Sequence, residues 1–202
     1  MRKIALLAFV FVSLILSTAC GSIVKYKEGD SSRSFMQGAD KILVKFDYSA
    51  TRVGRFATEA EYIESKMTEI DEKDPGKGEE WRVKWEEQKD SIFAYQFTKL
   101  MNDRINEKGI VVGTNLTDAP LTMIVHVMSI EPGWNVGVSR RNAEVDFIVK
   151  IYKTSDMNQP LVVYAMNKVQ GFGAMGYDFD AGYRMGQSFA RGGRELGRYL
   201  VK

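Results

Sequence analysis

The chain has 202 residues, a formal net charge of +2, 45% hydrophobic residues and 27% charged residues. This composition is that of a globular protein with a core, and it excludes a collagen, a disordered tail and a disulfide scaffold. One cysteine and one histidine exclude most zinc sites and most cysteine-based catalysis.

The first 19 residues have the order of a secretory signal peptide. Arg2 and Lys3 precede an apolar stretch over residues 4–16, which is too short to cross a membrane, and small residues follow up to Ala19. The only cysteine, Cys20, comes next. Cleavage of the signal peptide before Cys20 removes two of the 28 basic residues, and the remaining 26 equal the 26 acidic residues. The mature chain is then formally neutral, so it has no global field that would attract nucleic acid.

Residues 1–22 resemble the lipobox signal of bacterial lipoproteins. The resemblance implies cleavage before Cys20, acylation of its thiol, for example by palmitate, and anchoring to a membrane. Ser17 stands where this motif usually has Leu. Ser17 and Ala19 also satisfy the rule for ordinary signal peptidase, which would leave Cys20 with a free thiol. Gly21 after the cysteine implies sorting to the outer membrane by the enteric rule.

Residues 20–39 are polar and rich in Gly and Ser, and we expect the acylated Cys20 followed by a tether. Ile23, Val24 and Tyr26 leave a short docked strand as the alternative. A single periplasmic domain is then expected over residues 40–202. It begins with a half-buried strand from residue 40, in which apolar and charged residues alternate.

A charged region over residues 51–80 follows and contains a short surface helix. The pattern predicts one long helix from about residue 79 to residue 108, ended by Gly109. Its second half has one apolar stripe, but Trp81 and Trp85 lie on a different face, roughly 130° away. Either the helix breaks near Lys89, or the two tryptophans pack against something other than the main sheet.

Four strands and a helix complete the chain. The strands are predicted over residues 110–113, 121–131, 143–153 and 161–170, the last three as an antiparallel meander, and the closing helix over residues 178–202. The order β-α-β-β-β-β-α predicts an α+β fold. We expect a mixed, largely antiparallel sheet of about five strands with two long helices on one face.

This order, after a lipoprotein signal, is similar to that of small periplasmic α/β lipoprotein domains. Examples are those of curli-secretion lipoproteins and the amino-terminal domain of the Tol-system translocation protein. The resemblance covers about residues 40–202 and implies a role in envelope assembly or interaction. It rests on element order, so no functional residue is carried over from it.

The motifs that could indicate nucleotide binding, catalysis or metal binding are weak in this sequence. Residues 171–176 match GxGxxG, but no βαβ unit follows, so no nucleotide cofactor is expected. His126 lies among aliphatic residues in its strand and is expected to face the core. Neither a metal site nor a catalytic residue is predicted.

The closing helix carries a stripe of small residues spaced for one face. Glycine inside a helix is destabilising, so the stripe indicates close packing against the sheet, against the first helix, or against a partner subunit. The arginines at positions 184, 191 and 198 lie on the opposite side and are expected to be solvated. The stripe residues are Gly182, Gly186, Ala190, Gly193 and Gly197.

The sequence therefore predicts a membrane-anchored envelope lipoprotein of the outer membrane, without enzymatic activity. Its expected partners are the membrane, through Cys20, and an envelope protein or a second copy. The alternative is a periplasmic ligand- or peptide-binding module, and the aromatic residues open to a ligand or partner are Trp81, Trp85 and Trp134.

Overall fold

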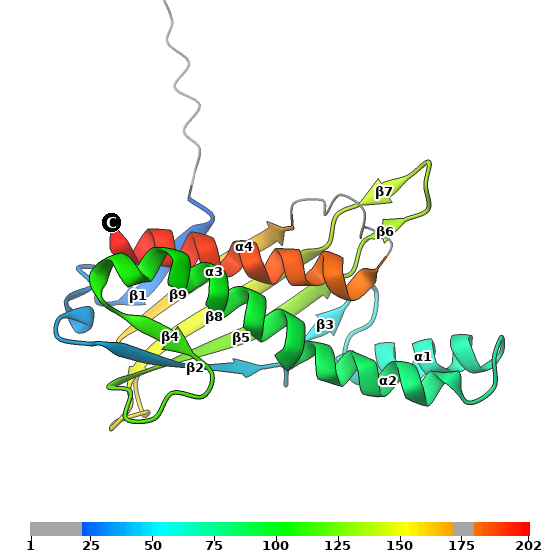
Figure 1. Ribbon diagram of the computed structural model, residues 1–202, viewed down its shortest axis with the longest axis horizontal. Coiled ribbons are helices and arrows are strands. Elements are labelled where there is room, and N and C mark those ends of the chain that lie inside the picture. The colour runs from blue at the N-terminus through cyan, green and yellow to red at the C-terminus, as the bar shows by residue number, and fades with distance from the viewer. Residues whose placement is uncertain (1–21, 172–179) are drawn as a thin grey trace, which may run out of the picture.

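A computed structural model describes residues 22–171 and 180–202 (Figure 1). Within these residues the chain forms an α+β fold, in which one mixed seven-stranded sheet carries helices on one face. The path of the sheet is β1-β9-β8-β5-β2-β4, and β3 pairs with β5. The strands are β1 (Val24–Gly29), β2 (Lys41–Asp47), β3 (Arg52–Val53), β4 (Val111–Gly113), β5 (Leu121–Glu131), β8 (Glu144–Lys153) and β9 (Val162–Gln170).

The predicted meander is confirmed. β5, β8 and β9 are neighbours and run antiparallel, and β2 pairs with β5 in parallel. β5 lies inside the sheet, between β2 and β8, which agrees with its apolar residues on both faces. The predicted fold class is therefore correct, and the sheet gains further strands at β1 and β3.

The tether predicted over residues 20–39 is wrong for residues 24–29, and the docked strand that the sequence left as the alternative is correct. These residues form β1, which pairs antiparallel with β9 at the edge of the sheet. Val24 is buried, and the other five residues of the strand are exposed. Main-chain hydrogen bonds to β9 hold this strand more than side-chain burial does, so the polar composition of the segment gives little sign of it.

The long helix predicted over residues 79–108 is interrupted. α2 (Lys77–Gln88) passes into a π-helical segment, η2 (Lys89–Ala94), and then into α3 (Tyr95–Ile105). A π-helical turn holds an extra residue, which rotates the following side chains by about 100° around the axis. This rotation offsets most of the roughly 130° between the two faces, so the tryptophan stripe and the apolar stripe of α3 come nearly into line. The Trp85 and Phe93 rings accordingly lie 6.4 Å apart. The short 3-10 segment η3 (Asn106–Lys108) follows, and Gly109, at φ 72°, ends the helix.

The tryptophans also pack away from the main sheet, so both alternatives hold together. α1 (Glu59–Asp71) lies beside α2 beyond one end of the sheet (Figure 1). Thr58 caps α1 by accepting a hydrogen bond from the Glu61 N–H. α4 (Ala181–Val201) closes the fold and runs beside α3 over the sheet.

The core lies between the sheet and the α3–α4 pair. Phe93 stacks on Phe189 with ring centroids 4.7 Å apart, and Phe97 and Phe147 complete the aromatic cluster. All four rings are fully buried. The opposite face of the sheet carries partly exposed side chains, among them Ile124 and His126 of β5.

Candidate functional site

The small-residue stripe of α4 faces α2, η2 and α3 of the same chain. A Cβ added at Gly193 would fall on the Phe97 carbonyl oxygen, and one at Gly197 would lie 2.9 Å from the Met101 oxygen. Ala190 is buried in the same row. The stripe is therefore internal packing between helices, the first-helix option that the sequence left open.

The ends of the stripe meet side chains instead of backbone. A Cβ at Gly186 would lie 2.6 Å from Ile92 Cγ2, and one at Gly182 would lie 2.5 Å from the Gln88 side chain. The two helices thus approach most closely in the middle and near the end of α4. A partner helix has no access to this row.

The arginines of α4 are not merely solvated, contrary to the prediction. Arg184 donates hydrogen bonds to the carbonyl oxygens of Pro132 and Gly133, each at 3.3 Å, and Arg191 donates to the Gln170 oxygen at 3.0 Å. Strand ends leave carbonyl oxygens without ladder partners, and guanidinium groups satisfy them. Arg198, which pairs with Glu195, is exposed as expected.

Two of the three tryptophans belong to a packed cluster. Trp81 and Trp85 stack with centroids 5.6 Å apart, and Tyr62 of α1 lies 5.1 Å from the Trp85 ring. The Trp85 indole N–H donates to Glu59 Oε1 at 2.7 Å, and the ring is only 2% exposed. These rings hold α1 on α2, and they also line a cavity of about 260 Å³ between α2 and the start of α4. Trp134 is instead exposed, on a hairpin between β5 and β8.

His126 does not face the core, so that prediction is wrong. Met123, Val125 and Val127 point toward the helices, and His126 lies on the opposite face with 24% of its side chain exposed. A bulge between Val127 and Ser129 breaks the alternation of side chains along β5. Unbroken alternation would place Ile130 on the same face as His126 and would make that face look like the core face.

His126 pairs with Asp47 across the parallel β2–β5 register. The distance from Nδ1 to Asp47 Oδ2 is 2.7 Å. The backbone N–H of Ser49, and then the His126 ring, hold the pKa of Asp47 below its ordinary value. His126 Nε2 is buried and has no hydrogen-bond partner among the described residues. A nucleophile would have to lie against this nitrogen for triad chemistry.

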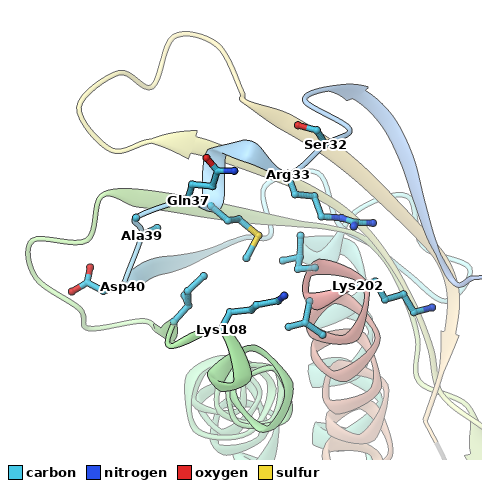
Figure 2. A pocket seen from close by; sticks show the side chains of 12 residues that line it. Ser32, Arg33, Gln37, Ala39, Asp40, Lys108 and Lys202 are labelled. Atoms are coloured by element: carbon cyan, nitrogen blue, oxygen red, sulfur yellow. The ribbon is translucent and has the colours of Figure 1, made fainter.

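A cavity of about 580 Å³ opens where three distant segments meet (Figure 2). Its wall combines the turn around η1 (Ser34–Met36), the end of η3 and the last residues of α4. The lining residues are Ser32, Arg33, Met36, Gln37, Gly38, Ala39, Asp40, Lys108, Ile110, Leu200, Val201 and Lys202. Sequence reasoning missed this site because each segment alone carries no motif.

Asp30 organises the turn beside the cavity. Its carboxylate accepts hydrogen bonds from the Ser32 and Ser34 hydroxyls, which hold its pKa far below the ordinary value. Arg33 adopts a left-handed backbone at φ 63°, and its guanidinium lies 4.6 Å from the centroid of the Tyr199 ring. The turn thereby places Arg33 over the end of α4 (Figure 2).

The cavity is amphipathic. Lys108 extends across the hollow toward the end of α4, whereas Asp40 points away from it (Figure 2). Met36, Ile110 and Leu200 supply apolar wall. Such a combination suits a small ligand with an anionic group and an apolar body.

Several sequence predictions lie outside the described residues. These are the signal peptide, Cys20, and residues 172–176 of the glycine-rich motif. Gly171 itself is described, and its N–H donates to Ser188 Oγ at 2.9 Å, while this hydroxyl donates to the Ala143 oxygen. Ser188 is fully buried and joins α4 to two strand ends, which is a structural role.

Across residues 22–171 and 180–202, no cluster of three or more His, Cys, Asp or Glu side chains could hold a metal ion. In the same residues no helix has the length and apolar character of a membrane span. No family model, curated protein or solved structure matches this chain. The class that its fold defines is an α+β domain with a mixed sheet covered by helices on one face.

Proposed function

We propose that this chain is a lipid-anchored component of the bacterial outer membrane that acts by contact with other envelope components and not by catalysis. The observation that carries the proposal is the order of Arg2 and Lys3, the apolar residues 4–16 and the single Cys20. Acyl chains on Cys20 would supply the membrane affinity.

The position of β1 supports close contact between the domain and the membrane. Val24 begins β1 only four residues after Cys20. Four extended residues span at most about 14 Å. An acylated Cys20 therefore holds the edge of the sheet at the headgroup layer, with no long tether between them.

The polar groups of the described residues support a role without catalysis. The hydroxyl of Ser188 is bound to backbone, and the carboxylate of Asp47 is held by Ser49 and His126. His126 Nε2 has no hydrogen-bond partner among the described residues, so no nucleophile there is aligned with this base. A catalytic role would need reactive groups that converge on one cavity.

The test is the fate of Cys20. In Cys20→Ala, lipid attachment should be lost and the protein should appear in the soluble fraction or as uncleaved precursor, whereas the matched control Ser22→Ala should stay in the outer membrane. Intact mass of the wild-type protein should show two or three acyl chains. A mature protein with an unmodified Cys20 thiol would contradict the proposal and indicate cleavage by ordinary signal peptidase.

The cavity beside Arg33 and Lys108 favours a second candidate, a module that binds an amphipathic anion. A ligand that binds only the folded state raises the melting temperature as its concentration rises. A medium-chain fatty acid is a suitable probe. A concentration-dependent rise that Lys108→Ala abolishes would support this candidate. Co-purification of a stoichiometric envelope protein without such a rise would support the contact role.

A further inference from the structure

A short hairpin projects from the sheet between β5 and β8. It consists of β6 (Trp134–Asn135), β7 (Arg140–Arg141) and the turn between them. The Val136 N–H donates to the Ser139 oxygen at 3.0 Å, and Gly137 has the positive φ, 81°, that the turn requires. We call this unit the β6–β7 hairpin.

α4 holds the base of the β6–β7 hairpin. The Arg184 guanidinium donates to the carbonyl oxygens of Pro132 and Gly133, just before β6. Trp134 pairs with Arg141 across the hairpin, and the Trp134 indole N–H donates to Ser139 Oγ at 3.3 Å. The hairpin is therefore a formed projection with a fixed root.

The tip of the β6–β7 hairpin is apolar and exposed. Val138 is fully exposed, Val136 is 67% exposed, and Trp134 is 43% exposed. Turns of this kind normally carry Gly, Asn, Asp or Ser, because these residues favour water and turn geometry. Adjacent exposed apolar side chains at the end of a projection indicate a surface that binds an apolar phase or partner.

Positive charge lies directly behind this tip. Residues 132–142 include Arg140 and Arg141 and no acidic residue, and the Arg141 guanidinium lies 5.7 Å from the centroid of the Trp134 ring. Glu131, at the root, lies 3.8 Å from Arg141. Arg141 lies opposite Trp134, and Arg140 lies opposite Asn135, one residue pair nearer the tip. The apolar tip is therefore followed by a level that holds both the indole and the arginines, which suits acyl chains beneath an interface with anionic headgroups.

The β6–β7 hairpin and the first residues of β1 leave the domain on the same side. In Figure 1 the hairpin and the start of the described chain both extend toward the top, and α1 and the β8–β9 turn lie toward the bottom. A membrane that holds the chain just before residue 22 therefore faces the hairpin tip. A partner placed at the bottom of this view would not reach it.

We infer that the β6–β7 hairpin inserts Val136 and Val138 into the surface of the membrane that anchors the chain, with Trp134 at the interface and Arg140 and Arg141 at anionic headgroups. The inference rests on the proposed function, because the lipid anchor supplies the membrane on this side. The hairpin then makes a second attachment that fixes the orientation of the domain, which a lone anchor does not.

The test uses the full acylated protein, reconstituted in vesicles of phosphatidylethanolamine and phosphatidylglycerol. Acylation consumes the thiol of Cys20, the only cysteine in the chain, so Val138→Cys supplies one site for an environment-sensitive fluorophore. The matched control is Met157→Cys, 40% exposed in the turn at the far end of β8. Neither substitution disturbs the core, because both side chains are exposed.

We expect the probe at residue 138 to emit at shorter wavelength in vesicles and to be quenched by nitroxide-labelled lipid, and the probe at residue 157 to do neither. Reversal of both charges, Arg140→Glu with Arg141→Glu, should reduce quenching at residue 138 in vesicles that contain phosphatidylglycerol. In vesicles of neutral lipid alone, quenching should be weaker from the start.

The outcomes separate the two proposals. Wild-type protein that reacts with the fluorophore at Cys20 would overturn the proposed function. Acylated protein whose probe at residue 138 behaves like the probe at residue 157 would overturn the hairpin inference and leave the anchor standing. A probe at residue 138 that is shielded in native membranes but exposed in vesicles would also overturn it, because an envelope protein would then cover the tip.

Discussion

The two faces of the sheet are built from the same strands but differ in what holds them. On the helix face, Phe147 of β8 packs against Phe97 and Phe189, and all three rings are fully buried. On the opposite face, polar side chains pair across strands. The pairs are His126 with Asp47, Ser129 with Asp146, and Thr122 with Thr154.

This difference between the two faces means that they contribute unequally to the free energy of folding. Each buried aromatic ring removes a large apolar area from water, whereas a hydrogen bond between partly exposed groups contributes only about 1 kcal/mol net. Most of the folding free energy therefore lies on the helix face. Changes on the opposite face should alter the surface and leave the fold nearly as stable.

The largest effect is expected for Phe189→Ala. The ring stacks on Phe93 at 4.7 Å and meets Phe147 edge-on at 5.2 Å, so its removal leaves a cavity that its neighbours cannot fill. We expect a loss of about 3–5 kcal/mol and a fall in Tm of roughly 10 °C by circular dichroism. Ile148→Ala, on the opposite face, is the control and should cost less than half as much. Equal losses would contradict the contrast between the faces.

A smaller effect is expected for the glycines between the helices. Ala at Gly193 would place its Cβ on the backbone oxygen of Phe97, which only a shift of the helices could relieve. Ala at Gly186 would meet only the Ile92 side chain, which can rotate. Helix propensity favours Ala by about 1 kcal/mol, and overpacking costs about 1–3 kcal/mol.

We therefore expect Gly193→Ala to lose about 1–2 kcal/mol in chemical denaturation and Gly186→Ala to stay within about 1 kcal/mol of wild type. The two variants differ only in what the new methyl group meets. If Gly193→Ala were as stable as wild type, α3 and α4 would not be in backbone contact at this point.

The smallest effect is expected for Asp47→Asn. The pKa of Asp47 is lowered in the folded protein, so its contribution is present above the ordinary value of 3.8 and is lost as the pH falls through the lower folded value. Since the side chain is partly exposed, we expect a cost of at most about 1 kcal/mol at pH 6 and a smaller one at pH 3. Denaturant titrations at both pH values measure it.

A difference between wild type and Asp47→Asn that widened on acidification would contradict this sign. His126→Gln is the companion variant, because it removes the ring but keeps a hydrogen-bonding group. It should also be nearly as stable as wild type. A variant that folds normally but loses all cellular function would instead give His126 a chemical role.

The sheet and its class could be predicted because their signals are local. Val145, Phe147, Val149 and Ile151 recur at every second position, with charged residues at 144, 146 and 150. This period places the four on one face whatever lies opposite. The candidate sites were harder to predict from the sequence, because they depend on contacts between distant segments. Residue spacing identified the α4 stripe, but not that the Phe97 carbonyl oxygen occupies the space beside Gly193.

The predictions that were wrong or missed also depend on contacts between distant segments and not on local patterns. The bulge at Val127 and Ser129 shifts the alternation of β5 only when β8 is paired with it, so the face of His126 could not be assigned from β5 alone. Val24 is the only buried residue of β1, so the sequence indicated a docked strand only as the alternative to a tether. The cavity beside Arg33 needs residues from three parts of the chain.

By itself the sequence determined the order and type of most elements and the amphipathic faces of the helices, because backbone geometry repeats every 2 or 3.6 residues. Only the tertiary structure decided which surface each face meets: α3 against the α4 stripe, β1 on the edge of β9, and the β6–β7 hairpin exposed. Apolar burial has no direction, so a pattern states that a face is buried and leaves its partner to the distant segments that fold against it.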